Sequence, residues 1–194
     1  MIYPIVAYGH PALREETQPI SPDYPELEQL IADMYETMYA ASGVGLAAPQ
    51  IGKSIRLFIV DGSAMEPAED QGEESLEGFK QVFINPEKIT ESGEPWQFEE
   101  GCLSIPGLRE PVSREPRIKM RFQDENFETY EREFFGVRAR IIQHEYDHLE
   151  GVLFTDYTKG LRKRMIRGKL QKISKGKIDA GYPMRLSTGQ IVDA

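Results

Sequence analysis

Apolar residues recur at helical spacing in two stretches of the chain. The first stretch covers residues 25–43, and its apolar positions are Leu27, Leu30, Ile31, Met34 and Met38. Steps of three and four residues predict a helix that turns one face toward a core. The second stretch covers residues 134–151 and ends at Gly151, a residue typical of the position just after a helix. The pattern therefore predicts two helices that are far apart in the sequence.

Branched and aromatic residues form short runs between these two helices. The run IRLFIVD at residues 55–61 predicts a strand. Further strands are expected at residues 81–86, 117–124 and 127–134, and the last two are close enough in sequence to form a hairpin. A further, basic helix is expected from about Asp156. Strands with helices around them favour the α+β class.

The composition is that of one soluble domain. A chain of 194 residues is long enough to bury a core, and its single cysteine excludes an internal disulfide framework. The chain does not start with a basic stretch followed by a long apolar one, and its longest apolar runs are too short to cross a bilayer. We therefore expect a cytoplasmic protein with one domain over residues 1–178 and a short C-terminal tail at residues 179–194.

The charge is distributed unevenly along the chain. The net charge is −9, yet nine of the 23 Lys and Arg residues lie within residues 157–178, which hold no acid. The rest of the chain holds 14 basic and 32 acidic residues, so its net charge is −18. A basic segment on an acidic body indicates either contact with an anionic partner or a solvated helix that balances the body. Residues 61–79 carry seven acids and are expected to form an exposed loop.

The second predicted helix contains QHEYDH, which matches the metal-binding pattern H-E-x-x-H. His144 and His148 are four residues apart and lie on one helix face, so that two imidazoles can bind one metal ion. Glu145 lies next to the first histidine and can act as a general base on water at the metal. The alternative is a solvated helix that carries the same residues without binding a metal.

A third ligand has to come from upstream of this helix. Phe154 occupies the position where metzincin enzymes have their third histidine, and no Glu follows Glu150. The candidate upstream is Cys102, because a thiolate with two imidazoles and an open fourth position is an accepted catalytic arrangement. The alternative for Cys102 is a buried filler of the core. His10 also lies upstream, in a Gly-His-Pro turn, and we interpret it as a structural or surface residue.

A third signal is the run GVGLAAPQIG at residues 43–52. Its glycines permit a close approach of the backbone to a ligand, and its small apolar residues indicate burial. Gln50 at the end of this run needs a partner for its amide. It could donate a hydrogen bond to a developing oxyanion, or it could be satisfied by nearby backbone.

Together, three segments resemble the signature motifs of the peptide deformylase family. They are GVGLAAPQ at residues 43–50, EGCLS at residues 100–104 and QHEYDHLEG at residues 143–151. The resemblance implies a compact α+β hydrolase, with the H-E-x-x-H helix packed between sheets, that removes the formyl group from the N-terminal formylmethionine of new polypeptides. It also implies a divalent metal ion bound by Cys102, His144 and His148. The usual ion in the family is Fe²⁺, and Zn²⁺, Ni²⁺ or Co²⁺ occurs in purified protein.

The resemblance also implies a role for each site residue. A hydroxide formed from water at the metal would attack the formyl carbonyl, and Glu145 would take up the proton and pass it to the leaving amine. The Gln50 side chain and the Leu103 N–H would stabilise the oxyanion. The residues that would contact the peptide backbone or the methionine side chain are Val44, Gly45, Gly107, Val137 and Ile141. The basic segment stands where the family has a C-terminal helix implicated in ribosome docking.

Two other classes of protein remain as alternatives. One is a metallopeptidase of the H-E-x-x-H type, against which the missing downstream ligand argues. The other is a nucleic-acid-binding module with a structural Cys-His-His site, which would need a fourth protein ligand and would not need Glu145.

Overall fold

The computed structural model describes residues 1–63, 65, 76–177 and 179–192 of the chain. Its three α-helices are α1 (Leu27–Ala40), α2 (Gly136–Leu149) and α3 (Gly160–Ser174). Three short 3₁₀ turns accompany them, η1 (Pro11–Leu13), η2 (Ala48–Ile51) and η3 (Phe154–Tyr157). Among the described residues, no helix combines the length and the apolar character that a membrane span requires.

The strands form one large sheet and two small ones. The large sheet is antiparallel, with the order β2-β3-β4-β7-β8. Its strands are β2 (Gly45–Ala47), β3 (Leu57–Asp61), β4 (Lys80–Ser92), β7 (Arg117–Gln123) and β8 (Thr129–Phe135). The second sheet is a hairpin of β5 (Trp96–Cys102) and β6 (Ile105–Arg114). The third joins β1 (Ile5–Val6), β9 (Met184–Arg185) and β10 (Ile191–Val192), with β1 and β9 parallel.

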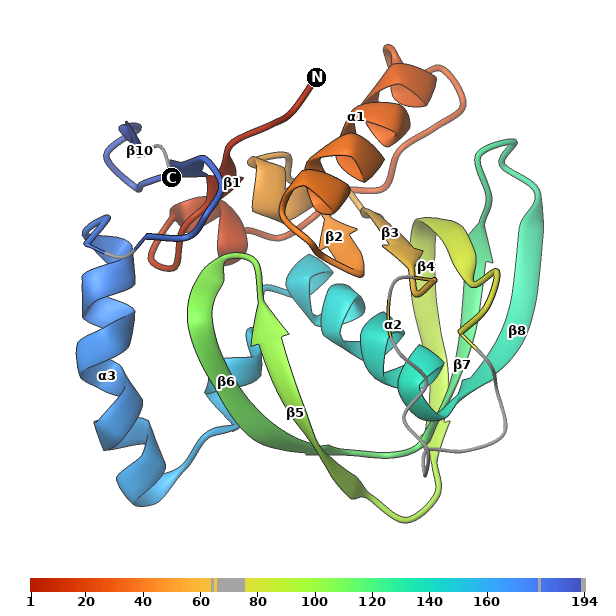
Figure 1. The fold of residues 1–194 in the computed structure, drawn as a ribbon. Coiled ribbons are helices and arrows are strands. Elements are labelled where there is room, and N and C mark those ends of the chain that lie inside the picture. Colours follow the sequence, from red (N-terminus) through yellow and green to blue (C-terminus); the bar gives the residue numbers. More distant parts are fainter. Residues whose placement is uncertain (64, 66–75, 178, 193–194) are drawn as a thin grey trace.

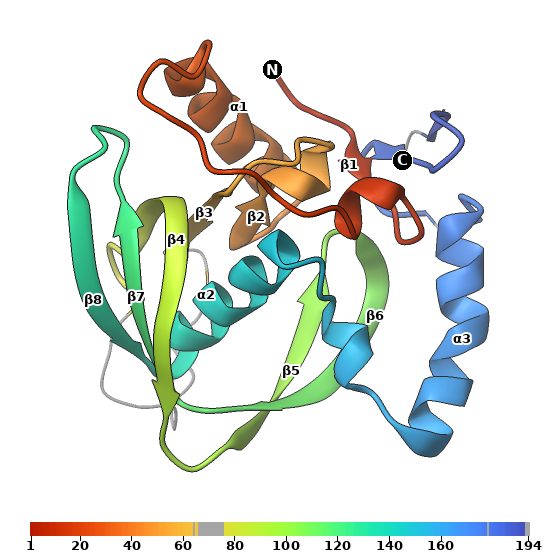
Figure 2. The same cartoon turned by 180° about the vertical axis from the view of Figure 1, so that it is seen from behind.

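Helix α2 lies between the large sheet and the β5–β6 hairpin (Figures 1 and 2). Its apolar residues Ala139, Ile142 and Leu149 are almost fully buried, in the same core cluster as Phe58 and Phe83 of the large sheet. Because both sides of α2 are covered, side chains on the hairpin side of the helix also lie in an enclosed environment. The α+β class with mixed sheets around this helix is confirmed.

The elements expected from periodicity are present. The helix expected within residues 25–43 is α1, and the hairpin expected from residues 117–134 is β7–β8. The β5–β6 hairpin is a finding that the pattern did not indicate. Pro106 and Pro111 lie within β6, and a strand of a two-stranded sheet has an outer edge at which a proline removes no ladder bond. The expected acidic loop at residues 61–79 lies largely outside the described residues.

Helix α3 packs apolar residues against the rest of the protein and exposes most of its cations. Ile166, Leu170 and Ile173 are buried in a core cluster that also contains Ile105 of β6. After α3 the chain returns to the body, where the Ile5 N–H donates to the carbonyl of Pro183 at 2.9 Å. This return places part of the C-terminal segment beside the β5–β6 turn.

Candidate metal centre and active site

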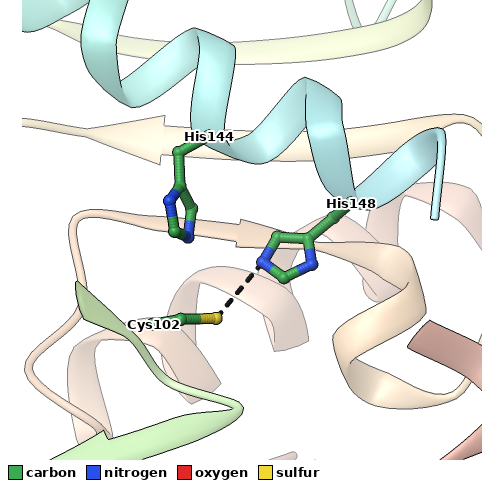
Figure 3. Close-up of side chains that lie close together, drawn as sticks. All are labelled: Cys102, His144 and His148. Carbon is green, nitrogen blue, oxygen red and sulfur yellow. Dashed lines mark hydrogen bonds between the residues drawn. The ribbon is translucent and has the colours of Figure 1, made fainter. Parts of the chain in front are cut away.

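Three ligand side chains converge from the hairpin and from α2. Cys102 is the last residue of β5, while His144 and His148 project from successive turns of α2 (Figure 3). One ligand atom of each residue lies within 4.8 Å of the other two. The Sγ of Cys102 is 3.3 Å from the Nε2 of His148, and the two imidazole rings meet edge to face. His10 lies elsewhere, where its Nδ1 accepts a hydrogen bond from the Ala12 N–H.

The donor set and its geometry fit one metal ion. Ligand atoms bound to one tetrahedral ion at about 2.0–2.3 Å lie about 3.3–3.8 Å apart. The Cys102–His148 separation of 3.3 Å falls in this range, and all three ligand atoms lie within 4.8 Å of one another. A thiolate with two imidazoles suits Fe²⁺, Zn²⁺, Ni²⁺ or Co²⁺. Within the described residues these three side chains are the only group of this kind that could hold a metal ion.

Glu145 is buried beside these residues. The residue is 4% exposed, and its Oε2 is a buried oxygen without a hydrogen-bond partner among the described residues. Burial raises the pKa of Glu145 to about 7, because desolvation penalises the charged carboxylate. A divalent cation next to it would favour the carboxylate and lower this pKa. The carboxyl group is therefore placed to exchange a proton with a group inside the site.

The glycines of residues 43–45 make room for the site. A Cβ on Gly45 would lie 2.4 Å from the Oε1 of Glu145, and a Cβ on Gly43 would lie 2.7 Å from the Cδ1 of Leu103. Real Cβ atoms essentially never approach that closely. A side chain at position 45 would therefore have to displace much of the Glu145 side chain, whose Cδ and Cγ also lie within 2.8 Å of the added Cβ, whereas at position 43 mainly the end of the Leu103 side chain would have to shift.

Gln50 has its amide oriented by two sets of contacts. Its Oε1 accepts a hydrogen bond from the Ala47 N–H at 2.8 Å. Its Nε2 therefore faces the hairpin, where it lies 3.5 Å from the Sγ of Cys102 and 3.4 Å from the Oγ of Ser104. The side chain is 1% exposed. The amide N–H groups thus point toward the ligand cluster.

A buried charge cluster, formed by Glu100, Arg114, Arg140 and Asp147, lies behind the ligands. Glu100 accepts hydrogen bonds from Arg114 Nε at 2.7 Å and from Arg140 Nη1 at 3.0 Å, and its Oε2 is 2.9 Å from the Nδ1 of His144. Arg114 also donates to Asp147 at 2.7 Å. This arrangement holds the His144 ring through the nitrogen that faces away from Cys102.

The titration of these groups follows from burial and their partners. Burial opposes the ionised form of Glu100, but hydrogen bonds from His144 and Arg114 outweigh it and hold its pKa far below the usual range. Burial also opposes the charged form of His144, yet contacts with Cys102 and Glu100 raise its pKa well above the usual value. His148 has a lowered pKa because it is buried beside His144. The pKa of the His144 imidazole is therefore raised and that of the His148 imidazole is lowered. Both imidazoles have to be neutral to bind a metal.

A cavity of about 1,020 Å³ opens next to the ligands. It lies between the turn before β2 and the β5–β6 hairpin, and Cys102, His144 and Glu145 are among the residues that line it. The sequence-predicted contact residues on its wall are Val44, Gly45, Gln50, Leu103, Gly107 and Ile141. Val137 is not among the lining residues and is 8% exposed in the core, one turn before Ile141 on α2.

Several residues around the site were not singled out from the sequence. Arg114, Arg140 and Asp147 were missed, although Arg140 and Asp147 are in the H-E-x-x-H helix, because charged residues on a helix usually face solvent. Tyr182 was missed too, since nothing in its local sequence connects it with the β5–β6 turn. Its hydroxyl donates to the Leu103 carbonyl at 2.7 Å. Only the tertiary fold brings these residues to the ligands.

Comparison with known proteins gives one consistent result. Residues 2–164 match the family model described as polypeptide deformylase. A peptide deformylase from Christiangramia forsetii is 52% identical over 188 residues, which covers 95% of this chain and 96% of that protein. One from Flavobacterium psychrophilum is 53% identical, over 96% of this chain and 97% of that protein.

Solved structures give the same result. The crystal structure of a peptide deformylase from Legionella pneumophila superposes with a TM-score of 0.78 at 36% identity, and the match covers 91% of this chain and 98% of that one. The enzyme from Thermotoga maritima has a TM-score of 0.72 at 38% identity, over 82% of this chain and 99% of that one.

Proposed function

Because the chain belongs to the polypeptide deformylase family of enzymes, we propose that it hydrolyses the formyl group from the N-terminal formylmethionine of newly made polypeptides and releases formate. The observation that carries this proposal is the convergence of Cys102, His144 and His148 beside a cavity that Cys102, His144 and Glu145 line. We assign the activity to the domain at residues 1–178 and its place to the cytoplasm, where new polypeptides begin.

Cys102, His144 and His148 would hold the divalent ion, for which we propose Fe²⁺, with Zn²⁺, Ni²⁺ or Co²⁺ as replacements in purified protein. When bound, the ion would supply Lewis acidity and make a water more acidic. The charge cluster behind His144 supports this assignment, since a ligating histidine commonly gives its other ring nitrogen to a carboxylate.

The chain's own residues would move the protons and stabilise the charge. Glu145 would accept a proton from the attacking water and return it to the leaving amine, a contribution of about 10²–10⁴-fold in rate. The amide N–H of Gln50 and the backbone N–H of Leu103 would donate to the formyl oxygen as it gains negative charge. The orientation of the Gln50 amide supports this role, since its Oε1 accepts from the Ala47 N–H and its Nε2 faces the hairpin.

The peptide substrate would lie along the cavity. We propose that the backbone of Val44, Gly45 and Gly107 pairs with the extended peptide and that Val44, Ile141 and Val137 bind the methionine side chain. The support is strongest for the lining residues Val44 and Ile141. Val137 would act from behind Ile141, since the two are four residues apart on α2.

The test is formate release from a short N-formyl-Met peptide by protein prepared without oxygen. The variant Glu145→Gln should retain its metal and lose about 10²–10⁴-fold of the turnover. The matched control is Glu150→Gln, which changes a partly exposed Glu of the same motif that pairs with Arg56 and should leave turnover unchanged. A metal-loaded wild type that releases no formate would refute the proposed activity. Cleavage of an unformylated peptide would favour the metallopeptidase alternative.

We also propose that the basic segment at residues 157–178 docks on the ribosome through rRNA phosphates. The exposed cations of α3 include Lys163, Arg164 and Arg167, and two neighbouring apolar residues, Leu161 and Met165, are 72% and 71% exposed. A surface that joins cations with exposed apolar side chains suits a ribonucleoprotein partner.

The docking proposal is tested by reversing the three α3 cations to Glu and measuring ribosome binding at about 50 and 200 mM salt. Binding should weaken sharply, and the salt dependence of the remaining binding should flatten. The control reverses three cations of the large sheet, Lys119, Arg121 and Arg132. Equal binding by both variants would refute docking through α3.

A further inference from the structure

The chain after α3 is anchored against the body near the β5–β6 turn. Strand β9 pairs with β1 in parallel, and the Ala7 N–H donates to the Arg185 carbonyl at 2.9 Å. Met184 and Leu186 are 3% and 5% exposed, in the core cluster that also contains Ile105. The pairing of β9 with β1 and the burial of these two side chains hold the segment in place, so the residues just before β9 have a defined position.

Tyr182 comes two residues before β9 and extends from this anchored segment to the turn. Its hydroxyl donates to the carbonyl of Leu103 at 2.7 Å. The next carbonyl, that of Ser104, accepts from the Tyr8 N–H at 2.8 Å. Two consecutive carbonyls of the EGCLS motif are thus held by residues near the two ends of the chain. The turn that carries Leu103 is supported from outside its own hairpin.

Tyr182 also belongs to the wall of the site. Tyr182 packs against two core clusters; Leu103 also packs against one of them, and Cys102 against the other. Tyr182 and Ala180 are among the residues that line the cavity beside Glu145. The family model ends at residue 164, so this contribution to the site comes from a part of the chain beyond the matched region.

We propose that Tyr182 is a positioning residue that holds the Leu103 carbonyl and thereby aims the Leu103 N–H at the reacting formyl oxygen. This inference rests on the proposed function, in which that N–H is one of the two donors to the oxyanion. The Leu103 carbonyl belongs to the peptide plane after Leu103, and the Leu103 N–H belongs to the peptide plane before it. Without the Tyr182 hydroxyl, the partly buried Leu103 carbonyl loses its hydrogen-bond donor, and the β5–β6 turn becomes more mobile.

The deciding variant is Tyr182→Phe, which keeps the ring and removes only the hydroxyl. A fully lost oxyanion donor costs about 10²–10³ in rate, and a misaimed donor should cost part of that, about tenfold in kcat. The KM for an N-formyl-Met peptide and the metal content should stay at wild-type values, since the variant keeps the aromatic ring in the cavity wall and leaves the ligands unchanged. The matched control is Tyr24→Phe, which removes the hydroxyl of another half-buried tyrosine, located in a groove that shares no lining residue with the site.

Hydrogen–deuterium exchange gives a readout that does not depend on activity. Amides of residues 102–105 should exchange faster in metal-loaded Tyr182→Phe than in the wild type or in Tyr24→Phe. Unchanged exchange together with wild-type kcat would overturn the proposal, as would a loss of kcat explained by an equal loss of metal. A wild type without formate release refutes the proposed function instead, and the exchange data then still decide whether Tyr182 holds the turn.

Discussion

Two groups of paired charges in this protein are similar in composition and differ in their surroundings. The buried charge cluster of Glu100, Arg114, Arg140 and Asp147 lies behind the ligand His144. The other group, here called the outer ladder, crosses three strands of the large sheet. It consists of Glu87 on β4, Lys119 and Arg121 on β7 and Glu131 on β8.

Exposure separates the two groups. The side chains of Glu100, Arg114 and Arg140 are 3%, 5% and 2% exposed, whereas those of Arg121 and Glu131 are 53% and 41% exposed. A buried charge without its partner pays a desolvation cost of several kcal/mol, and an exposed one is simply rehydrated. An Arg–Glu pair therefore fixes the geometry of its side chains in the buried charge cluster, whereas in the outer ladder it contributes little to stability.

The largest expected effect is that of Arg114→Met. This change leaves Glu100 with fewer donors and Asp147 without its closest cation, so we expect the free energy of unfolding to fall by about 3–5 kcal/mol. Urea unfolding of the metal-free protein measures it. The double variant Arg114→Met/Glu100→Gln should recover part of the loss, because it removes both charges. If Arg114→Met alone lowers the free energy of unfolding by less than about 1 kcal/mol, the buried charge cluster contributes no more to stability than the outer ladder.

The second prediction concerns the link between the cluster and the metal. Glu100→Gln keeps the shape of the side chain but weakens the contact to His144, so we expect metal affinity to fall by about 10–100-fold. Competition with a chelator measures this affinity, and circular dichroism verifies that the variant is folded. The matched control is Glu131→Gln in the outer ladder. An equal change in both variants would show that the carboxylate behind His144 has no special role.

The contrast between the two groups also shows what could be predicted from the sequence. The spacing of His144 and His148 predicts a shared helix face, and elimination of downstream ligands leads to Cys102. The sequence does not mark Arg114 of the cluster as buried, since its neighbours Ser113 and Glu115 are polar, whereas Arg121 of the ladder stands between the apolar residues Met120 and Phe122. Their difference arises because α2 covers one surface and solvent covers the other.

The same limit applies to the fold. Helical periodicity indicates α1 and α2, and the alternation in residues 117–134 indicates the β7–β8 hairpin, since the apolar residues of each element recur at regular spacing. The β5–β6 hairpin has prolines and charges in its strands, and its partners in the charge cluster are up to 40 residues away in sequence, as between Glu100 and Arg140. Strand β9 is two residues long, and only its pairing with β1 and β10 defines it. Elements of this kind depend on tertiary contacts.

The smallest expected effect is that of Arg121→Met, which removes an exposed cation of the outer ladder. Both ion pairs of Arg121 are long, at 3.3 and 3.4 Å, and the side chain is half exposed. We expect the free energy of unfolding to fall by about 0.2–1 kcal/mol, measured in urea because guanidinium chloride would itself screen the charges.

At about 1 M NaCl, where the Debye length is about 3 Å, this loss of stability should vanish. The loss in Arg114→Met should persist at the same salt concentration, because salt screens a buried pair far less. If both losses persist or both vanish, burial is not what distinguishes the two groups of charges.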